Sequence, residues 1–134
     1  LLPVDHLIAK STDATEGRVT TGEAIEDGYL GVDIGPKTIS QFKIAIQESA
    51  TVFWNGPMGV FENSAFNKGT LSIAENLANS SCVKIVGGGD SAAAAEASGY
   101  ASKMTHISTG GGASLEYLQG DRLPGLEVLR TKIR

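Results

Sequence analysis

Two runs of three glycines are the residues of this sequence best suited to chemistry. The first, at residues 87–89, follows an apolar run at 83–86. The second, at residues 110–112, follows an expected short strand at 104–108. Glycine lets the backbone come close to a ligand and take dihedral angles that other residues avoid. A helix beginning directly after such a turn directs free N–H groups and the positive end of its dipole at the same point.

The repeated arrangement predicts one site for several phosphate oxygens. Ligands of open α/β sheets bind beyond the carboxyl ends of the strands, where both triplets would lie. A single triplet could merely form a tight turn. Two triplets, each between a strand and a helix, favour the anion site.

The neighbouring residues narrow the kind of phosphate site. No Gly-x-x-x-x-Gly-Lys-Ser/Thr motif is present, which excludes a P-loop. Gly87, Gly89 and Ala92 fit a dinucleotide-binding pattern, but the acidic residue expected about twenty positions later is absent, so the fit is weak. Asp90 suits a Mg²⁺ ion that accompanies a nucleotide, since hard cations take carboxylate and phosphate oxygens. Asp90 could instead cap the helix, and the two roles are compatible.

A third turn follows the β-type run at residues 51–54, in the stretch Trp54-Asn55-Gly56-Pro57. Trp54 fits a buried core position better than a stacking platform. Glu62, which follows shortly after, could be a solvated loop acid or could accept a hydrogen bond from a ribose hydroxyl.

Short strands alternate with helices along the chain. Strands are expected at residues 1–9, 29–34, 51–54, 83–86 and 104–108, with a short hairpin at 18–20 inside a polar excursion at 10–28. Helices are expected at residues 38–48, with Thr38 as N-cap, and at 65–78, 91–97 and 113–118, and the tail after residue 125 is expected to pack or fray. This order predicts βαβ units in one open, mainly parallel sheet with helices on both faces, a Rossmann-like α/β three-layer sandwich. The strands at 52–54, 83–86 and 104–108 should be neighbours.

Composition excludes several classes of protein. The 134 residues are 41% hydrophobic and 19% charged, which is enough to bury a core and too apolar for disorder. The net charge of −4 argues against nucleic-acid and anionic-membrane partners, which require a basic face. Cys82, the single cysteine, lies in an apolar run and predicts a buried, inert thiol in a reducing compartment. No apolar run is long enough for a membrane span, so the expected location is the cytoplasm.

Several stretches of the sequence resemble phosphoglycerate kinase in their order and spacing. They are Asp33-Ile34-Gly35-Pro36, Trp54-Asn55-Gly56-Pro57-Met58-Gly59-Val60-Phe61-Glu62, Gly87-Gly88-Gly89-Asp90-Ser91, His106-Ile107-Ser108-Thr109-Gly110-Gly111-Gly112-Ala113-Ser114-Leu115-Glu116 and Leu123-Pro124-Gly125. The resemblance covers essentially the whole chain. It implies a two-lobed, monomeric kinase of glycolysis. Its C-terminal lobe would hold Mg-ATP or Mg-ADP, and its N-terminal lobe 3-phosphoglycerate or 1,3-bisphosphoglycerate.

The resemblance also implies roles for individual residues. Those at the nucleotide would be Gly31 and Val32 beside the adenine, Glu62 at the ribose, and Asn55, Gly88, Gly89, Asp90 and Ser91 at the phosphates and metal. Asp90 would be the Mg²⁺ ligand. Gly110, Gly111 and Gly112 would face the transferring phosphoryl group, where N–H groups stabilise the spreading charge.

Parts of the family pattern are absent from the sequence. The N-terminal lobe, with its basic substrate patch and phosphate-orienting arginine, has no counterpart, nor have two phosphate-facing lysines and a further glycine triplet. Together with a first residue that is not Met, this predicts that residues 1–134 are the C-terminal part of the nucleotide-binding domain of a longer enzyme and are inactive alone. Residues 11–23 are expected to be a divergent surface loop. The alternatives are a dinucleotide-binding module and a structural piece that binds nothing.

Overall fold

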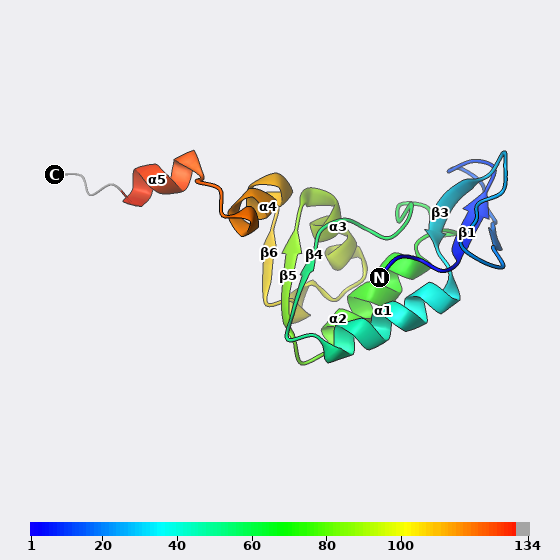
Figure 1. The fold of residues 1–134 in the computed structure, drawn as a ribbon, viewed down its shortest axis with the longest axis horizontal. Helices are drawn as coiled ribbons and strands as arrows, with labels where there is room; N and C mark the ends of the chain where they lie inside the picture. The colour runs from blue at the N-terminus through cyan, green and yellow to red at the C-terminus, as the bar shows by residue number, and fades with distance from the viewer. Residues whose placement is uncertain (131–134) are drawn as a thin grey trace.

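The structure, a computed structural model, describes residues 1–130 and consists of two small sheets connected by helices (Figure 1). Its strands are β1 (His6–Ala9), β2 (Arg18–Val19), β3 (Leu30–Ile34), β4 (Thr51–Trp54), β5 (Val83–Gly87) and β6 (His106–Ser108). Its helices are α1 (Pro36–Glu48), α2 (Lys68–Ala78), α3 (Gly89–Ala97), the 3₁₀ turn η1 (Ala101–Lys103), α4 (Gly111–Gln119) and α5 (Pro124–Arg130). The part of the expected tail at residues 131–134 lies outside the described residues.

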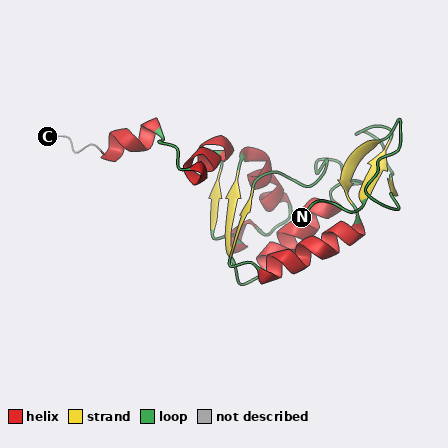
Figure 2. Cartoon of the chain, in the orientation of Figure 1, coloured by secondary structure: helices red, strands yellow, loops and turns green. Residues whose placement is uncertain are grey.

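The second half of the chain forms the parallel sheet that the sequence predicts. The strand order is β4-β5-β6, and both pairings are parallel (Figure 2). Trp54 is in register with Val86, and Gly87 with Ser108, so the three strands end at one edge of the sheet. The expected neighbourhood of these strands is confirmed, as is the α/β fold class with a parallel sheet flanked by helices.

The first part of the chain does not join that sheet, although the sequence predicted a single layer. β2, β1 and β3 form a separate antiparallel sheet in that order. The physical reason is the excursion at residues 10–28, which contains no helix and returns the chain directly alongside β1. Strands joined in this way pair antiparallel, whereas a parallel pairing requires a crossover, usually a helix.

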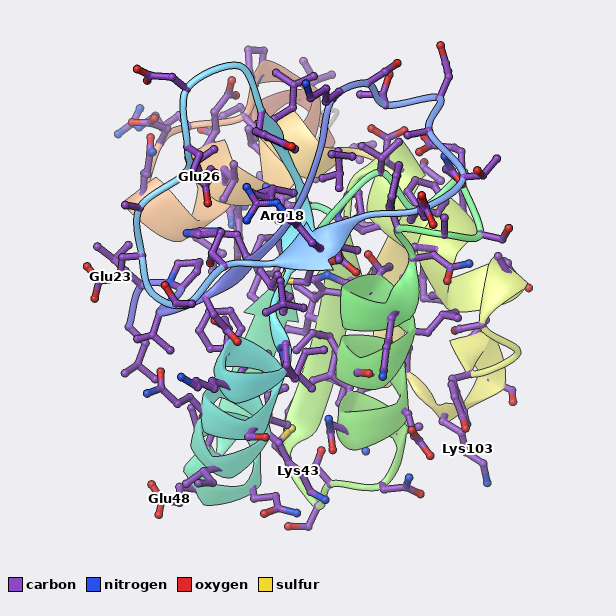
Figure 3. The ribbon with its side chains drawn as sticks, turned by 90° about the vertical axis from the view of Figure 1, so that its right-hand side faces the viewer. Arg18, Glu23, Glu26, Lys43, Glu48 and Lys103 are labelled. Carbon is purple, nitrogen blue, oxygen red and sulfur yellow. The ribbon has the colours of Figure 1, made fainter. Side chains whose placement is uncertain are left out.

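The excursion carries a cationic and aromatic cluster on the surface. Arg18 donates a hydrogen bond to the carboxylate of Glu26, and its guanidinium lies 4.7 Å from the centre of the Tyr29 ring. Figure 3 shows Arg18 and Glu26 in the upper half of the view, away from Lys43 and Glu48 of α1 near the bottom. Arg18 and Glu26 are both about half exposed, so their ion pair contributes little to stability.

Two cores hold the fold together. The larger lies between the parallel sheet and α1, α2 and α3, and its buried residues are Ile46, Trp54, Ile73, Ala74, Leu77, Cys82, Val86, Ala94, Ala95 and Met104. The smaller places Phe66 against Ala9 and Val32 of the antiparallel sheet. Because side chains alternate along a strand, Phe53 and Ile85 lie on the other face of the parallel sheet, where they line a hollow bordered by α4. No helix within residues 1–130 is long and apolar enough to cross a bilayer.

The helices begin two or three residues from their expected starts, and the expectation that Thr38 caps the first one was wrong. α1 begins at Pro36, so Thr38 lies inside its first turn. The cap comes instead from Asp5, whose carboxylate accepts hydrogen bonds from Lys37 N–H (3.0 Å), Thr38 N–H (2.8 Å) and the Thr38 hydroxyl (2.7 Å). A negative charge at this position also interacts favourably with the helix dipole.

The environment of Asp5 makes its charge stabilising. Burial alone would raise its pKa, but the hydrogen bonds from Thr38 and Lys37 outweigh burial and lower the pKa below the ordinary 3.8. A lowered folded-state pKa gives stability that is present above the unfolded-state pKa and is lost as the pH falls through the folded-state value.

We expect Asp5→Asn to lower the free energy of unfolding by about 2 kcal/mol at pH 7, because hydrogen bonds to a buried charge are lost. Urea unfolding from pH 7 to pH 3 checks this. The difference in the free energy of unfolding between the variant and the wild type should stay constant near neutral pH. It should become smaller as the pH falls below 3.8. A difference of the same size at both ends of the range would contradict the assigned role.

Candidate functional site

The two glycine loops lie side by side at the carboxyl edge of the parallel sheet. The N–H of Gly88 donates to the carbonyl of Ser108 at 2.9 Å, which connects the end of β5 to the end of β6. A Cβ atom added to Gly111 would lie 3.0 Å from the Cα of Gly88. The backbones of the two loops are therefore in contact. A side chain at Gly111 would push the two loops apart, which explains why glycine is needed at this position.

Both loops open directly into helices. Gly88, with φ at +98°, is the N-cap residue of α3, and Gly110 is the N-cap residue of α4. The first intrahelical bonds run from Ala92 N–H to Gly88 and from Ser114 N–H to Gly110. The N–H groups in the first turn of each helix have no partner inside that helix. Neither helix has a side-chain cap to bind them. Two sets of backbone donors and two positive dipole ends thus meet at one place, as an anion site requires.

The turn after β4 completes this cluster. The Asn55 Oδ1 atom lies 3.1 Å from the position that a Cβ would take on either Gly88 or Gly111, so the amide contacts both loops. The Ser91 hydroxyl accepts a hydrogen bond from Gly56 N–H at 2.5 Å. Ser91 is 1% exposed, so in this structure it ties the turn to α3. We refer to Asn55, Gly88–Ser91 and residues 110–112 as the glycine cluster.

Asp90 presents an unengaged carboxylate at this edge. It is exposed in the first turn of α3, and among the described residues its side chain makes no hydrogen bond. Within residues 1–130 no three His, Cys, Asp or Glu side chains are grouped so that they could hold a metal. A hard cation at Asp90 would take its remaining ligands from phosphates and water, which is how Mg²⁺ is usually bound beside a nucleotide. The residues present therefore fit a Mg²⁺ ion that arrives with an anionic ligand.

The remaining predicted site residues form a second group beside the antiparallel sheet. Gly31 is exposed in β3, whereas Val32 is 1% exposed and packs with Phe66 in the smaller core. The Val32 carbonyl accepts a hydrogen bond from Val60 N–H at 2.9 Å, which connects β3 to the loop containing Glu62. The exposed Glu62 lines a surface hollow with residues that include Thr12, Asp13, Asn63 and Ser64.

The structure also adds residues to which the sequence analysis gave no role. The Ser108 carbonyl joins the two glycine loops, and the Thr70 hydroxyl accepts a hydrogen bond from Met58 N–H at 3.0 Å. Asp33 connects β3 to α2 through Gly69 N–H at 2.6 Å. Of these, Asp33 left a signal in the sequence, because an acid stands between apolar residues in an expected strand.

The parallel sheet and its glycine cluster define an α/β protein of the open-sheet class, in which ligands bind beyond the carboxyl ends of the strands. The sequence profile described as phosphoglycerate kinase matches residues 1–121. This chain belongs to the phosphoglycerate kinase family.

Individual relatives agree with this assignment. The phosphoglycerate kinase of Bdellovibrio bacteriovorus is 67% identical over 100% of this chain, and that of Clostridium perfringens is 53% identical over 98% of it. The solved structure of phosphoglycerate kinase from Coxiella burnetii superposes on the whole chain with a TM-score of 0.85 and 35% identity. The chain spans about a third of the length of each: 34%, 33% and 35%, respectively.

Proposed function

We propose that residues 1–134 are the C-terminal part of the nucleotide-binding lobe of a phosphoglycerate kinase. The enzyme transfers a phosphoryl group reversibly between 1,3-bisphosphoglycerate with ADP and 3-phosphoglycerate with ATP. The observation that supports this most strongly is the contact between Gly88 and Gly111, which brings two helix N-termini to one point. Such a point suits the several phosphate oxygens of a nucleotide better than a single small anion.

In the proposed mechanism this chain binds and orients the nucleotide. The first-turn N–H groups of α3 take the phosphates, and those of α4, from Gly111 onward, face the phosphoryl group as it transfers. Charge spreads over the oxygens of that group in a loose transition state, and fixed N–H donors stabilise it without having to reorganise. Asp90 would hold the Mg²⁺ ion, which neutralises phosphate charge when it is bound.

The second group of residues is assigned to the nucleoside. Gly31 is exposed on β3, with the Ile25 side chain beside it, and we assign this part of the strand to the flat face of an adenine. Val32 supports this wall from the smaller core, and the Glu62 carboxylate can accept hydrogen bonds from ribose hydroxyls. Positioning of this kind contributes much of the rate in a transfer reaction, because the protein holds two substrates in line.

The rest of the enzyme supplies the other substrate. 3-phosphoglycerate or 1,3-bisphosphoglycerate would bind to an N-terminal lobe outside this chain, where a basic patch is expected. We propose that the intact enzyme is a cytoplasmic monomer of glycolysis that uses Mg-ATP or Mg-ADP. We propose no nucleic-acid or membrane partner, which agrees with the negative net charge of the chain.

The isolated 134-residue chain should show turnover near background. In this proposal the phosphoglycerate site lies in the other lobe, and the loss of a cationic clamp alone costs on the order of 10³-fold in rate in phosphoryl transfer. The measurement is ATP formation from 1,3-bisphosphoglycerate and ADP by the purified chain. Activity that returns when the remainder of the enzyme is added in trans would agree with the proposal. Turnover near that of an intact enzyme, in a sample free of host enzyme, would contradict it.

A second prediction concerns the metal. In a full-length phosphoglycerate kinase carrying this segment, Asp90→Asn should lower kcat on the order of 10²-fold, since a metal ion contributes several kcal/mol of charge stabilisation. It should also raise the Mg²⁺ concentration needed for half-maximal rate and leave the melting temperature nearly unchanged.

Glu96→Gln is the matched control, because Glu96 is an exposed acid further along the same helix. It should leave both the rate and the magnesium dependence unchanged. If Asp90→Asn behaves like this control, Asp90 serves only the helix and the metal assignment is wrong.

A further inference from the structure

Asp33 is a buried carboxylate at the point where β3 approaches the start of α2. Its exposed fraction is 4%. Its Oδ2 accepts a hydrogen bond from Gly69 N–H at 2.6 Å, and its Oδ1 accepts one from Ile34 N–H at 2.8 Å. Burial raises the pKa of Asp33, and these two hydrogen bonds oppose that rise. The Asp33 carboxyl group is thus buried in surroundings that disfavour its charged form.

One role of the Asp33 carboxylate is to cap α2. Asn67 stands at the N-cap position but forms no side-chain cap, and its φ of −101° and ψ of 0° are not those of a usual capping residue. Asp33 satisfies a free N–H group of the first turn from a position 36 residues away in the sequence. A negative charge at this end of the helix is favourable.

The geometry goes beyond a cap, because both the loop before α2 and the first turn of α2 approach the same carboxylate closely. A Cβ on Gly69 would lie 2.2 Å from Asp33 Oδ1, and a Cβ on Gly59 would lie 2.7 Å from it and 2.5 Å from the Val32 carbonyl oxygen. Neither glycine has a positive φ, so close approach is the reason for glycine at both positions. The two glycines stand on either side of Glu62 in the sequence.

Further bonds extend this contact along the loop. Val60 N–H donates to the Val32 carbonyl at 2.9 Å, next to Asp33. Met58 N–H donates to the Thr70 hydroxyl at 3.0 Å, in the first turn that Asp33 caps. Residues 59–69 are therefore fixed against β3 at their start and enter α2 at their end, and Glu62 lies between these two points.

We propose that Asp33 is a positioning residue for the nucleoside half of the substrate. It holds the segment at residues 59–69 against β3, so that Glu62 and Gly31 face the ribose and base at a fixed separation. This inference rests on the proposed function. In it, Asp33 touches no substrate itself and acts through the loop containing Glu62, which contacts the nucleoside.

The test uses a full-length phosphoglycerate kinase carrying residues 1–134. Asp33→Ala should raise the KM for Mg-ADP on the order of tenfold, less than the roughly 10²-fold that a 1 Å misplacement of reacting groups can cost. The KM for 1,3-bisphosphoglycerate and the kcat at saturating Mg-ADP should change by less than about twofold, because the hydrogen bonds of Asp33 go to Gly69 and Ile34 and not to the glycine cluster. Asp33→Asn, which keeps one carbonyl acceptor, should show a smaller rise.

Asp5→Asn is the matched control, since Asp5 is also a buried acid that caps a helix from a distant position. It should lower stability and leave the KM for Mg-ADP unchanged. Equal effects of the Asp5 and Asp33 variants on that KM would overturn the inference, because they would reduce Asp33 to a stabilising residue.

Gly59→Ala decides the matter if the Asp33 variants do not fold. It leaves the Asp33 residue unchanged, but its Cβ would press on the Val32 carbonyl oxygen and on Asp33, so it should push the loop away from β3 and also raise the KM for Mg-ADP. An unchanged KM in Gly59→Ala would overturn the inference. The proposed function is tested separately by Glu62→Ala: if that variant and the wild type have the same KM for Mg-ADP, the ribose assignment itself is wrong.

Discussion

The contact between the backbones of Gly88 and Gly111 is the constraint on which the rest of this site depends. It requires two parallel strands that end together, because only then do the following loops meet at one edge of the sheet. It also requires the absence of side chains, since even one Cβ on Gly111 would press on Gly88. With these conditions met, the first turns of α3 and α4 present their N–H groups to the same space.

Buried carboxylates arrange the other half of the molecule. Asp5 fixes the start of α1 and Asp33 the start of α2, each from the antiparallel sheet or its approach. The small sheet therefore sets where the two long helices begin, and those helices cover the parallel sheet through the larger core. The two sheets are thus connected, and the loop containing Glu62 runs from the glycine cluster to the antiparallel sheet, where Val60 N–H bonds to the Val32 carbonyl.

The sequence was sufficient for features that depend on local pattern and insufficient for those that depend on distant partners. Strand–glycine–helix order predicted the parallel sheet, because a right-handed crossover leaves little choice of topology. The separate antiparallel sheet was missed, since hydrophobic runs do not reveal which strand pairs with which. Thr38 was misread as a cap because the true cap, Asp5, lies 33 residues away. Asp33 had no assigned role for the same reason. For Glu62 and Asp90 the residues alone left two roles open each, and the family resemblance favoured the ribose and the metal, respectively.

The central claim is that both glycine loops bind one and the same ligand. The most direct measurement follows the backbone amide resonances of Gly88, Gly89, Gly111 and Gly112 by NMR in a full-length phosphoglycerate kinase carrying this segment, labelled with ¹⁵N-glycine, during a titration with Mg-ADP. We expect the amides of both loops to shift together and to yield a single Kd. Shifts confined to one loop, or two loops that titrate with different Kd values, would contradict a shared site.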